Sequence, residues 1–171
     1  VVSRYDTYQE LEKYMYGSAT VVGYTMSHII GFKEGALPYA RSLAEAFQMT
    51  NFLSDIKEDF DERGRIYIPL EDMNRFGVTE SHIEKGIVDE KWRSLMRFEI
   101  ERTRVLYTIG VFGISYLNKS GRRAVYAAAL IYKEILDKIE KNNYDIFSRR
   151  AVVSPFRKTV LLLKSLCKTN L

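Results

Sequence analysis

Hydrophobic and polar positions along this chain repeat with the 3.6-residue period of α-helices. The clearest stretch covers about residues 122–141, where an apolar stripe is formed by Ala124, Ala127, Ala128, Ile131, Ile135 and Ile139. The same period predicts long helices over about residues 6–30, 38–60 and 89–117, and a last amphipathic helix from Pro155. We therefore expect an all-α fold made of long helices.

Proline, glycine and threonine residues mark the breaks between these helices. Pro38 suits the first turn of its helix, because its missing N–H would be unpaired there in any case. Thr79 is a good N-cap after a short segment at 70–76, and loops are expected at 61–69 and 142–154. Since no linker or repeat divides the chain, residues 1–171 are expected to belong to one domain.

Composition is that of an ordinary soluble globular protein, with 46% hydrophobic and 28% charged residues. No apolar run approaches the roughly 20 residues of a membrane span, so we expect a cytoplasmic location in which any membrane contact is peripheral. The net charge of +4 suits an anionic partner such as a phosphate group or a lipid surface. The basic residues are dispersed along the chain, which argues against nucleic acid as the partner.

An amide and two acids recur at every fourth position, as Asn51, Asp55 and Asp59. Four residues advance a helix by about 6 Å and 400°, so these side chains share one face, with Gln48 one turn earlier. Exposed like charges at this spacing repel by roughly 0.2–0.5 kcal/mol, whereas a divalent cation between them reverses the sign. Mg²⁺ prefers oxygen ligands and is often held by one or two carboxylates together with substrate phosphates.

The plain alternative is a solvated helix face, which is the usual reason for paired acids. Three features favour a binding site instead. The polar stripe extends back to Gln48, apolar residues such as Phe52 share the helix, and a loop with Arg63 and Arg65 follows directly. Arginine side chains in that loop could take further phosphate oxygens.

Three ordered motifs resemble a known family. The stretch "FQMTNFLSDIKEDFDERGRIYIP" looks like the second aspartate-rich motif of the squalene/phytoene synthases, the head-to-head prenyl diphosphate synthases. "YMYGSATVVG" is similar to the tyrosine-led helix of that family, and "AALIYKEILDKIEKNNYDIFSRRAVVSPFRK" is similar to its C-terminal motif. The resemblance covers almost the whole chain.

The resemblance implies a bundle of helices around a central apolar cavity, the isoprenoid synthase fold, with Mg²⁺, or Mn²⁺ in its place, held against prenyl diphosphates at the cavity mouth. It assigns Asn51, Asp55 and Asp59 to the metal, and Tyr14, Asp55 and Asp59 to catalysis. The residues implied to contact diphosphate or to line its site are Gln48, Asn51, Arg65, Tyr67, Tyr132 and Arg149. Ala19 and Val22 are implied to touch the prenyl chains.

The implied reaction condenses two prenyl diphosphates head to head through a cyclopropyl diphosphate. "RGRIYIP" and "NNYDIFSRRAVVS" favour the phytoene synthase type, which joins two geranylgeranyl diphosphates in carotenoid biosynthesis. The first alternative is a squalene or dehydrosqualene synthase that uses farnesyl diphosphate. The second is a catalytically silent relative that serves in protein assembly. No glycine-rich nucleotide fingerprint is present, so nothing in the sequence points to NADPH.

One part of the family pattern is absent from this sequence. The family has a first aspartate-rich motif upstream of the tyrosine-led helix, and no other D-x-x-x-D occurs here. Ser54 also stands where the family usually has a basic residue. We therefore expect the chain to be the C-terminal portion of a single prenyl synthase domain, inactive by itself without the N-terminal half.

Overall fold

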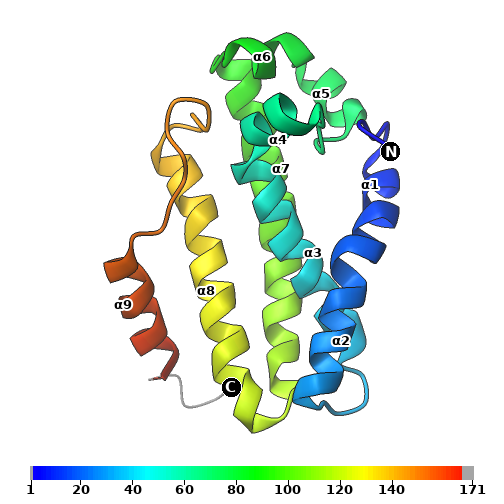
Figure 1. The fold of residues 1–171 in the computed structure, drawn as a ribbon, viewed down its shortest axis with the longest axis vertical. Helices are drawn as coiled ribbons and strands as arrows, with labels where there is room; N and C mark the ends of the chain where they lie inside the picture. Colours follow the sequence, from blue (N-terminus) through cyan, green and yellow to red (C-terminus); the bar gives the residue numbers. More distant parts are fainter. Residues whose placement is uncertain (1, 167–171) are drawn as a thin grey trace.

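The computed structural model describes residues 2–166, which fold into helices without a β-sheet. Figure 1 shows α3 and α7 side by side at the centre, α1 and α2 on one side, and α8 with α9 outside it on the other. The elements are α1 (Tyr8–Met15), η1 (Tyr16–Thr20), α2 (Val21–Ile30), α3 (Leu37–Ser54), α4 (Ile56–Arg63), α5 (Leu70–Phe76), α6 (Glu80–Lys85), α7 (Glu90–Phe112), η2 (Gly113–Tyr116), α8 (Lys119–Lys141) and α9 (Pro155–Leu166).

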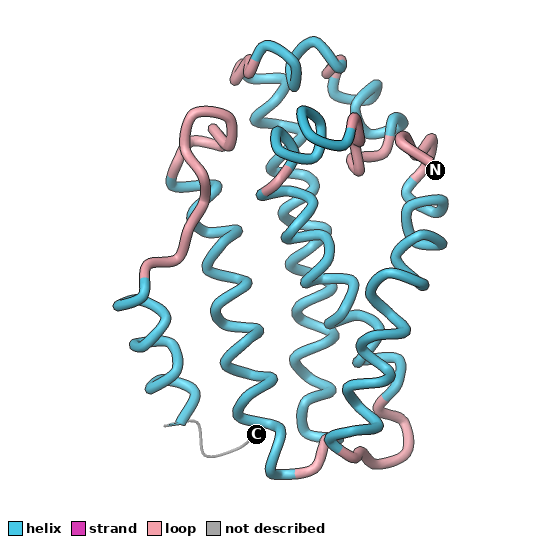
Figure 2. The backbone as a smooth tube through the Cα atoms, viewed as in Figure 1, coloured by secondary structure: helices cyan, strands magenta, loops and turns pink. Residues whose placement is uncertain are grey.

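The two ends of the bundle have different structures. At one end the short helices α4, α5 and α6 lie together near the start of α1, as Figure 1 shows. At the other end α2 stops, η2 leads into α8, and a single antiparallel bridge joins Phe32 to Leu117. Figure 2 shows the long loop between α8 and α9, residues 142–154, at the same end as α4.

Most predicted helices are confirmed, and so are several of their boundaries. Thr79 caps α6: its hydroxyl oxygen accepts from the backbone of His82, whose ring nitrogen Nδ1 accepts from the Thr79 N–H. Pro155 is the first residue of α9, as expected. The predicted helix at 89–117 becomes α7 followed by the 3₁₀ turn η2, and α8 starts at Lys119, slightly earlier than predicted.

The predicted helix over residues 6–30 is present with a π-helical turn, η1, in its middle. One extra residue per turn is accommodated there without a break, and such turns often occur at functional sites. Ala19 and Thr20 are buried in this turn, while Gly17 and Ser18 remain exposed. The helix ends before Gly31, whose φ of 83° favours glycine.

The predicted single helix over residues 38–60 is wrong in one respect, because the chain is interrupted at Asp55. Asp55 has φ −110° and ψ 14°, and the Ser54 hydroxyl donates both to the Asn51 carbonyl (3.1 Å) and to Asp55 Oδ1 (2.9 Å). This local side-chain bonding competes with regular helix. The i→i−4 backbone bonds persist, from Asp55 to Asn51 (2.9 Å) and from Asp59 to Asp55 (2.8 Å), so the backbone continues in nearly the same helical path across the break.

The hydrophobic core lies between α3, α7 and α8 and extends under the short helices. Trp92 is fully buried and its Nε1 donates to the Tyr144 carbonyl at 2.9 Å, which ties the start of α7 to the loop after α8. A second cluster beside α1 contains Leu11, Met15 and Met49. Over the described residues, 2–166, every helix is too short or too polar to cross a bilayer.

Candidate active site

The three residues that the sequence grouped lie where α3 passes into α4: Asn51 is in α3, Asp55 is at the break, and Asp59 is in α4. Asp59 is 7% exposed, whereas Asn51 and Asp55 are half-buried. Arg63 forms a short ion pair with Asp59 one turn later in α4. Arg63 was expected in the loop at 61–69, but it is the last residue of α4 and pairs with Asp59.

Burial raises the pKa of Asp59 from its ordinary value. The Arg63 guanidinium works against this rise, and the neighbouring negative charges of Asp55 and Glu58 add to it. A cation close to Asp55 and Asp59 would remove the repulsion and favour the ionised carboxylate. The electrostatics thus suit a positively charged ligand at this position.

The donor set at this end fits part of a magnesium site. It comprises two carboxylates and one amide, all oxygen donors of the kind that Mg²⁺ selects. Among residues 2–166, no three His, Cys, Asp or Glu side chains are arranged to hold a metal ion. Asn51, Asp55 and Asp59 offer two carboxylates and one amide, fewer ligands than the octahedral shell of Mg²⁺.

A cation from the loop after α8 also reaches the acids. The Arg150 guanidinium lies 3.6 Å from Asp55 Oδ1 and 3.5 Å from Glu58 Oε2. Arg149, the residue implied by the resemblance, is exposed next to it, and its charge helps to lower the pKa of Asp145. Sequence reasoning did not single out Arg150, because nothing local relates it to a residue 95 positions earlier.

Tyr14 and Tyr67 belong to one group of aromatic rings near the acids. Tyr67 stacks on Phe52 with centroids 3.9 Å apart, and Tyr14 lies 5.7 Å from Tyr67 and 5.4 Å from Tyr5. Arg65 Nη1 donates to the Tyr67 hydroxyl at 3.1 Å. Burial, and then the adjacent Tyr67, raise the pKa of Tyr14. The rings of Tyr5 and Phe52 were not predicted as part of the site.

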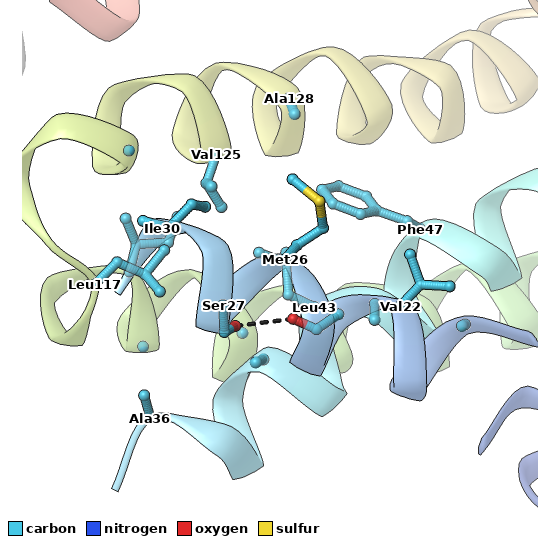
Figure 3. Close-up of a pocket in the computed structure, with 18 of the residues that line it drawn as sticks. Val22, Met26, Ser27, Ile30, Ala36, Leu43, Phe47, Leu117, Val125 and Ala128 are labelled. Carbon is cyan, nitrogen blue, oxygen red and sulfur yellow. Dashed lines mark hydrogen bonds between the residues drawn. The ribbon is translucent and has the colours of Figure 1, made fainter. Parts of the chain in front are cut away.

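An apolar cavity of about 540 Å³ lies between α2, α3, α7 and α8. Figure 3 shows Val22, Met26 and Phe47 directed into it, with Val125 and Ala128 of α8 opposite. The predicted residues Ala19, Val22 and Gln48 all line it. Gln48 is the lining residue that comes nearest in sequence to the acids, one helical turn before Asn51.

The far end of the cavity lies at the turn region where α2 ends and η2 leads into α8. Ile30, Leu117 and Gly121 line it there, and a Cβ at Gly121 would lie 2.5 Å from Ile30 Cγ2. The Ser27 hydroxyl is bonded to the Gly23 carbonyl at 2.8 Å, so this polar group is satisfied within its own helix (Figure 3). The cavity wall is therefore almost entirely apolar, which suits an apolar ligand.

Tyr132 takes a position beside the cavity. Its ring packs on Phe47 at a centroid distance of 4.7 Å, and Phe47 itself lines the cavity. The structure therefore brings together residues from the tyrosine-led helix, the aspartate-rich motif and α8. Their individual roles in catalysis and binding stay predictions.

The chain belongs to the squalene/phytoene synthase family, whose family model matches residues 1–157. It is 43% identical over 173 residues to the 15-cis-phytoene synthase of Synechocystis sp., a match covering 94% of this chain and 51% of that protein. It is 41% identical over 174 residues to the phytoene synthase of Arthrospira platensis, covering 94% of this chain and 56% of that protein. The chain spans about half the length of the curated relatives it matches.

Solved structures support the same fold. The crystal structure of a dehydrosqualene synthase in complex with ligand matches with a TM-score of 0.88 and 30% identity, over 96% of this chain and 58% of that chain. The expected all-α isoprenoid synthase fold is confirmed, and so is the resemblance to the family and to its phytoene synthases in particular.

Proposed function

We propose that this chain is part of a phytoene synthase-type prenyltransferase, which condenses two geranylgeranyl diphosphates head to head in carotenoid biosynthesis. The observation that carries the proposal is the apolar cavity whose wall includes Gln48, one helical turn before Asn51 in the stretch that continues to Asp55 and Asp59. An apolar pocket with a few polar groups at one end suits a prenyl diphosphate. The names of the most similar relatives, which are phytoene synthases, support this choice of reaction.

The polar end would bind the diphosphate. Asp55, Asp59 and Asn51 would hold Mg²⁺, or Mn²⁺, which when bound neutralises the charge of the leaving diphosphate. Arg65, Arg149 and Arg150 would bring further positive charge to its oxygens. These groups stabilise negative charge where it develops as the carbon–oxygen bond breaks.

The aromatic group and the cavity would protect the carbocation left behind. The ring faces of Tyr14, Tyr67 and Phe52 lie close together and can stabilise a cation by roughly 2 kcal/mol or more in a dry site. Apolar residues such as Val22 and Val125 in the cavity wall offer no nucleophile to trap it. The double bond of the second prenyl chain would then attack the cation, and loss of one proton would close the ring of a cyclopropyl diphosphate, whose own diphosphate leaves in turn.

The remaining ligands would come from a segment of the full-length protein that this chain does not include. Val22, Met26 and Ile29 of α2 are large apolar residues with exposures of 56%, 49% and 73%, and a covering segment would remove them from water. We propose that this segment is the N-terminal half of the domain and carries the first aspartate-rich motif. We expect the enzyme to be cytoplasmic, with any membrane contact peripheral.

A second candidate uses the same site on a shorter substrate. The structural match to a dehydrosqualene synthase at 30% identity favours head-to-head condensation of two farnesyl diphosphates as the alternative. Assaying the full-length enzyme with each diphosphate separates the two candidates by the length of the product.

The proposal is tested with Asp55→Asn and Asp59→Asn in the full-length enzyme. Each should lower kcat by about 10²–10³, the usual cost of losing one group that stabilises transition-state charge. Asp61→Asn is the matched control, because Asp61 is on the same helix but exposed and paired with Lys57. The folded fraction is checked by circular dichroism. Near-normal turnover in either site variant, or an equal loss in the control, would contradict the proposal.

A further inference from the structure

Three charged side chains are packed together where α5 meets α7, outside the site described above. Arg102 Nη1 donates to Asp72 Oδ2 at 2.8 Å and to both carboxylate oxygens of Glu99, at 3.0 and 2.9 Å. Glu99 is fully buried, and Asp72 is 4% exposed. We call Asp72, Glu99 and Arg102 the α5–α7 cluster.

The α5–α7 cluster is balanced in charge only if it holds a proton. Two carboxylates face one guanidinium, so full ionisation would leave a net negative charge in the interior, which is costly. Burial raises the pKa of Glu99 to about 8, and the adjacent Asp72 adds to the rise while Arg102 opposes it. At neutral pH, protonated Glu99 therefore leaves one ion pair and a neutral acid.

Arg102 also contacts the first helix. Its guanidinium carbon lies 4.2 Å from the centre of the Tyr8 ring and 4.6 Å from that of Phe98. Tyr8 begins α1, and its backbone N–H donates to Glu71 Oε1 at 2.7 Å. Farther out, the negative charges of Glu12 in α1 and Glu45 in α3 act on Tyr8. Thus a single guanidinium joins α1, α5 and α7.

The segment before α5 is bonded to the segment before α1. Backbone N–H groups of Ile66, Leu70 and Glu71 donate to the carbonyls of Ser3, Tyr5 and Asp6, at 3.0, 2.9 and 3.0 Å. Residues 66–71 include Tyr67, and residues 3–8 lead directly into α1, which carries Tyr14. The position of α5 therefore fixes both tyrosines relative to each other.

We propose that Arg102, held between Asp72 and Glu99, is a positioning residue that sets the placement of Tyr14 and Tyr67 in the active site. The inference rests on the proposed function, since it concerns the geometry of that site. Arg102 acts through α1 and α5 and does not itself touch the substrate. The buried proton makes this arrangement sensitive to alkaline pH.

The direction of the pH effect follows from the raised pKa of Glu99. Its contribution to stability is fully present below the ordinary glutamate value of 4.5 and is lost as pH rises through about 8. Above that pH the ionised Glu99 repels Asp72 and weakens the hold on α5. Activity that depends on this geometry should fall about tenfold per pH unit on the alkaline side.

Glu99→Gln is the decisive variant, because a neutral amide can accept from Arg102 and donate to Asp72 at every pH. In the full-length enzyme, kcat at pH 7 should stay within about twofold of wild type, a change of only a few tenths of a kcal/mol. The alkaline fall near pH 8 should disappear. Glu101→Gln is the matched control, since Glu101 is exposed on the same helix and pairs with Arg104; its pH profile should match wild type.

Arg102→Lys keeps the charge but loses the planar guanidinium, whose Nη1 bonds both acids and which lies over the rings of Tyr8 and Phe98. It should lower kcat by about tenfold or more while the folded fraction, checked by circular dichroism, is unchanged.

Hydrogen exchange of the backbone amides supplies a readout apart from activity. After correction for intrinsic rates, residues 3–8 and 66–72 should exchange faster at pH 9 than at pH 7 in wild type but not in Glu99→Gln.

The outcomes separate this inference from the proposed function. An alkaline limb that stays in place in Glu99→Gln, wild-type kcat in Arg102→Lys, or pH-independent protection of residues 3–8 and 66–72 would each overturn the positioning role. Absence of condensation product from wild type at every pH would instead refute the proposed function, and the exchange measurement would still test the α5–α7 cluster.

Discussion

Replacing Gly110 by alanine tests whether the close contact between α7 and α3 shapes the cavity. A Cβ at position 110 would lie 2.7 Å from the N, Cα and Cβ atoms of Leu43. Two of these are backbone atoms, so the clash cannot be relieved by rotating a flexible side chain. Both Gly110 and Leu43 line the cavity, which means that any shift of α3 away from α7 also changes its wall.

The expected magnitude is the difference of two effects. Alanine gains about 1 kcal/mol of helix propensity over glycine, and overpacking a tight contact costs about 1–3 kcal/mol. The upper part of that range applies to Gly110→Ala because backbone must move, leaving a net destabilisation of about 1–2 kcal/mol. For a chain of this size the melting temperature should fall by about 2–8 °C.

The assay is thermal unfolding followed by circular dichroism, with Gly17→Ala as the matched control. Gly17 lies in a helical segment, but a Cβ there would meet nothing within 4 Å. This control should therefore melt at the wild-type temperature or a few degrees above it, because only the propensity gain of up to about 1 kcal/mol applies. A Gly110→Ala variant that melts at or above the wild-type temperature would refute the reasoning.

Two further predictions concern the site. Tyr14→Phe in the full-length enzyme should keep much of the wild-type steady-state kcat, and Tyr14→Leu should be at least about tenfold slower than Tyr14→Phe. A ring contact of roughly 1.4 kcal/mol already gives that factor. Equal losses in the two variants would assign the role to the hydroxyl. Ala128→Phe should shift the preference of the enzyme from geranylgeranyl towards shorter prenyl diphosphates, because the larger side chain projects into the cavity. Product length measured in a mixture of diphosphates checks this, and an unchanged preference would show that Ala128 does not limit the chain.

The helices could be predicted from sequence because their ends are marked locally. Pro38 and Pro155 lie in the first turns of α3 and α9, and Thr79 caps α6, as the residue types indicate. The π turn at 16–20 and the break at Asp55 were not predicted. Each of these irregularities alters a single turn and leaves the hydrophobic period on either side unchanged. Periodicity judged over several turns of sequence therefore does not reveal them.

The candidate site was predictable where its residues follow each other along one stretch of chain, and it was missed where distant segments meet. Backbone i→i−4 bonds link Asn51, Asp55 and Asp59 across the break, at the spacing seen in the sequence. Arg150 reaches Asp55 from a loop far along the chain. No local pattern encodes that distance, and only the packing of the 142–154 loop beside α4 creates it.

Sequence spacing alone also fails to show which acidic residues outside a motif are buried. Asp72 has no acidic partner four residues away, and Glu99 and Arg102 have the i,i+3 spacing of a common surface pair. Neither pattern indicates burial, yet Asp72 and Glu99 are both buried around one guanidinium. An exposed pair of this kind contributes at most about 1 kcal/mol, whereas a buried cluster with a surplus acid must hold a proton or open. The same residue pattern is therefore a solvated surface in one setting and a pH-sensitive support for the active site in the other, and burial, which depends on the whole fold, decides between them.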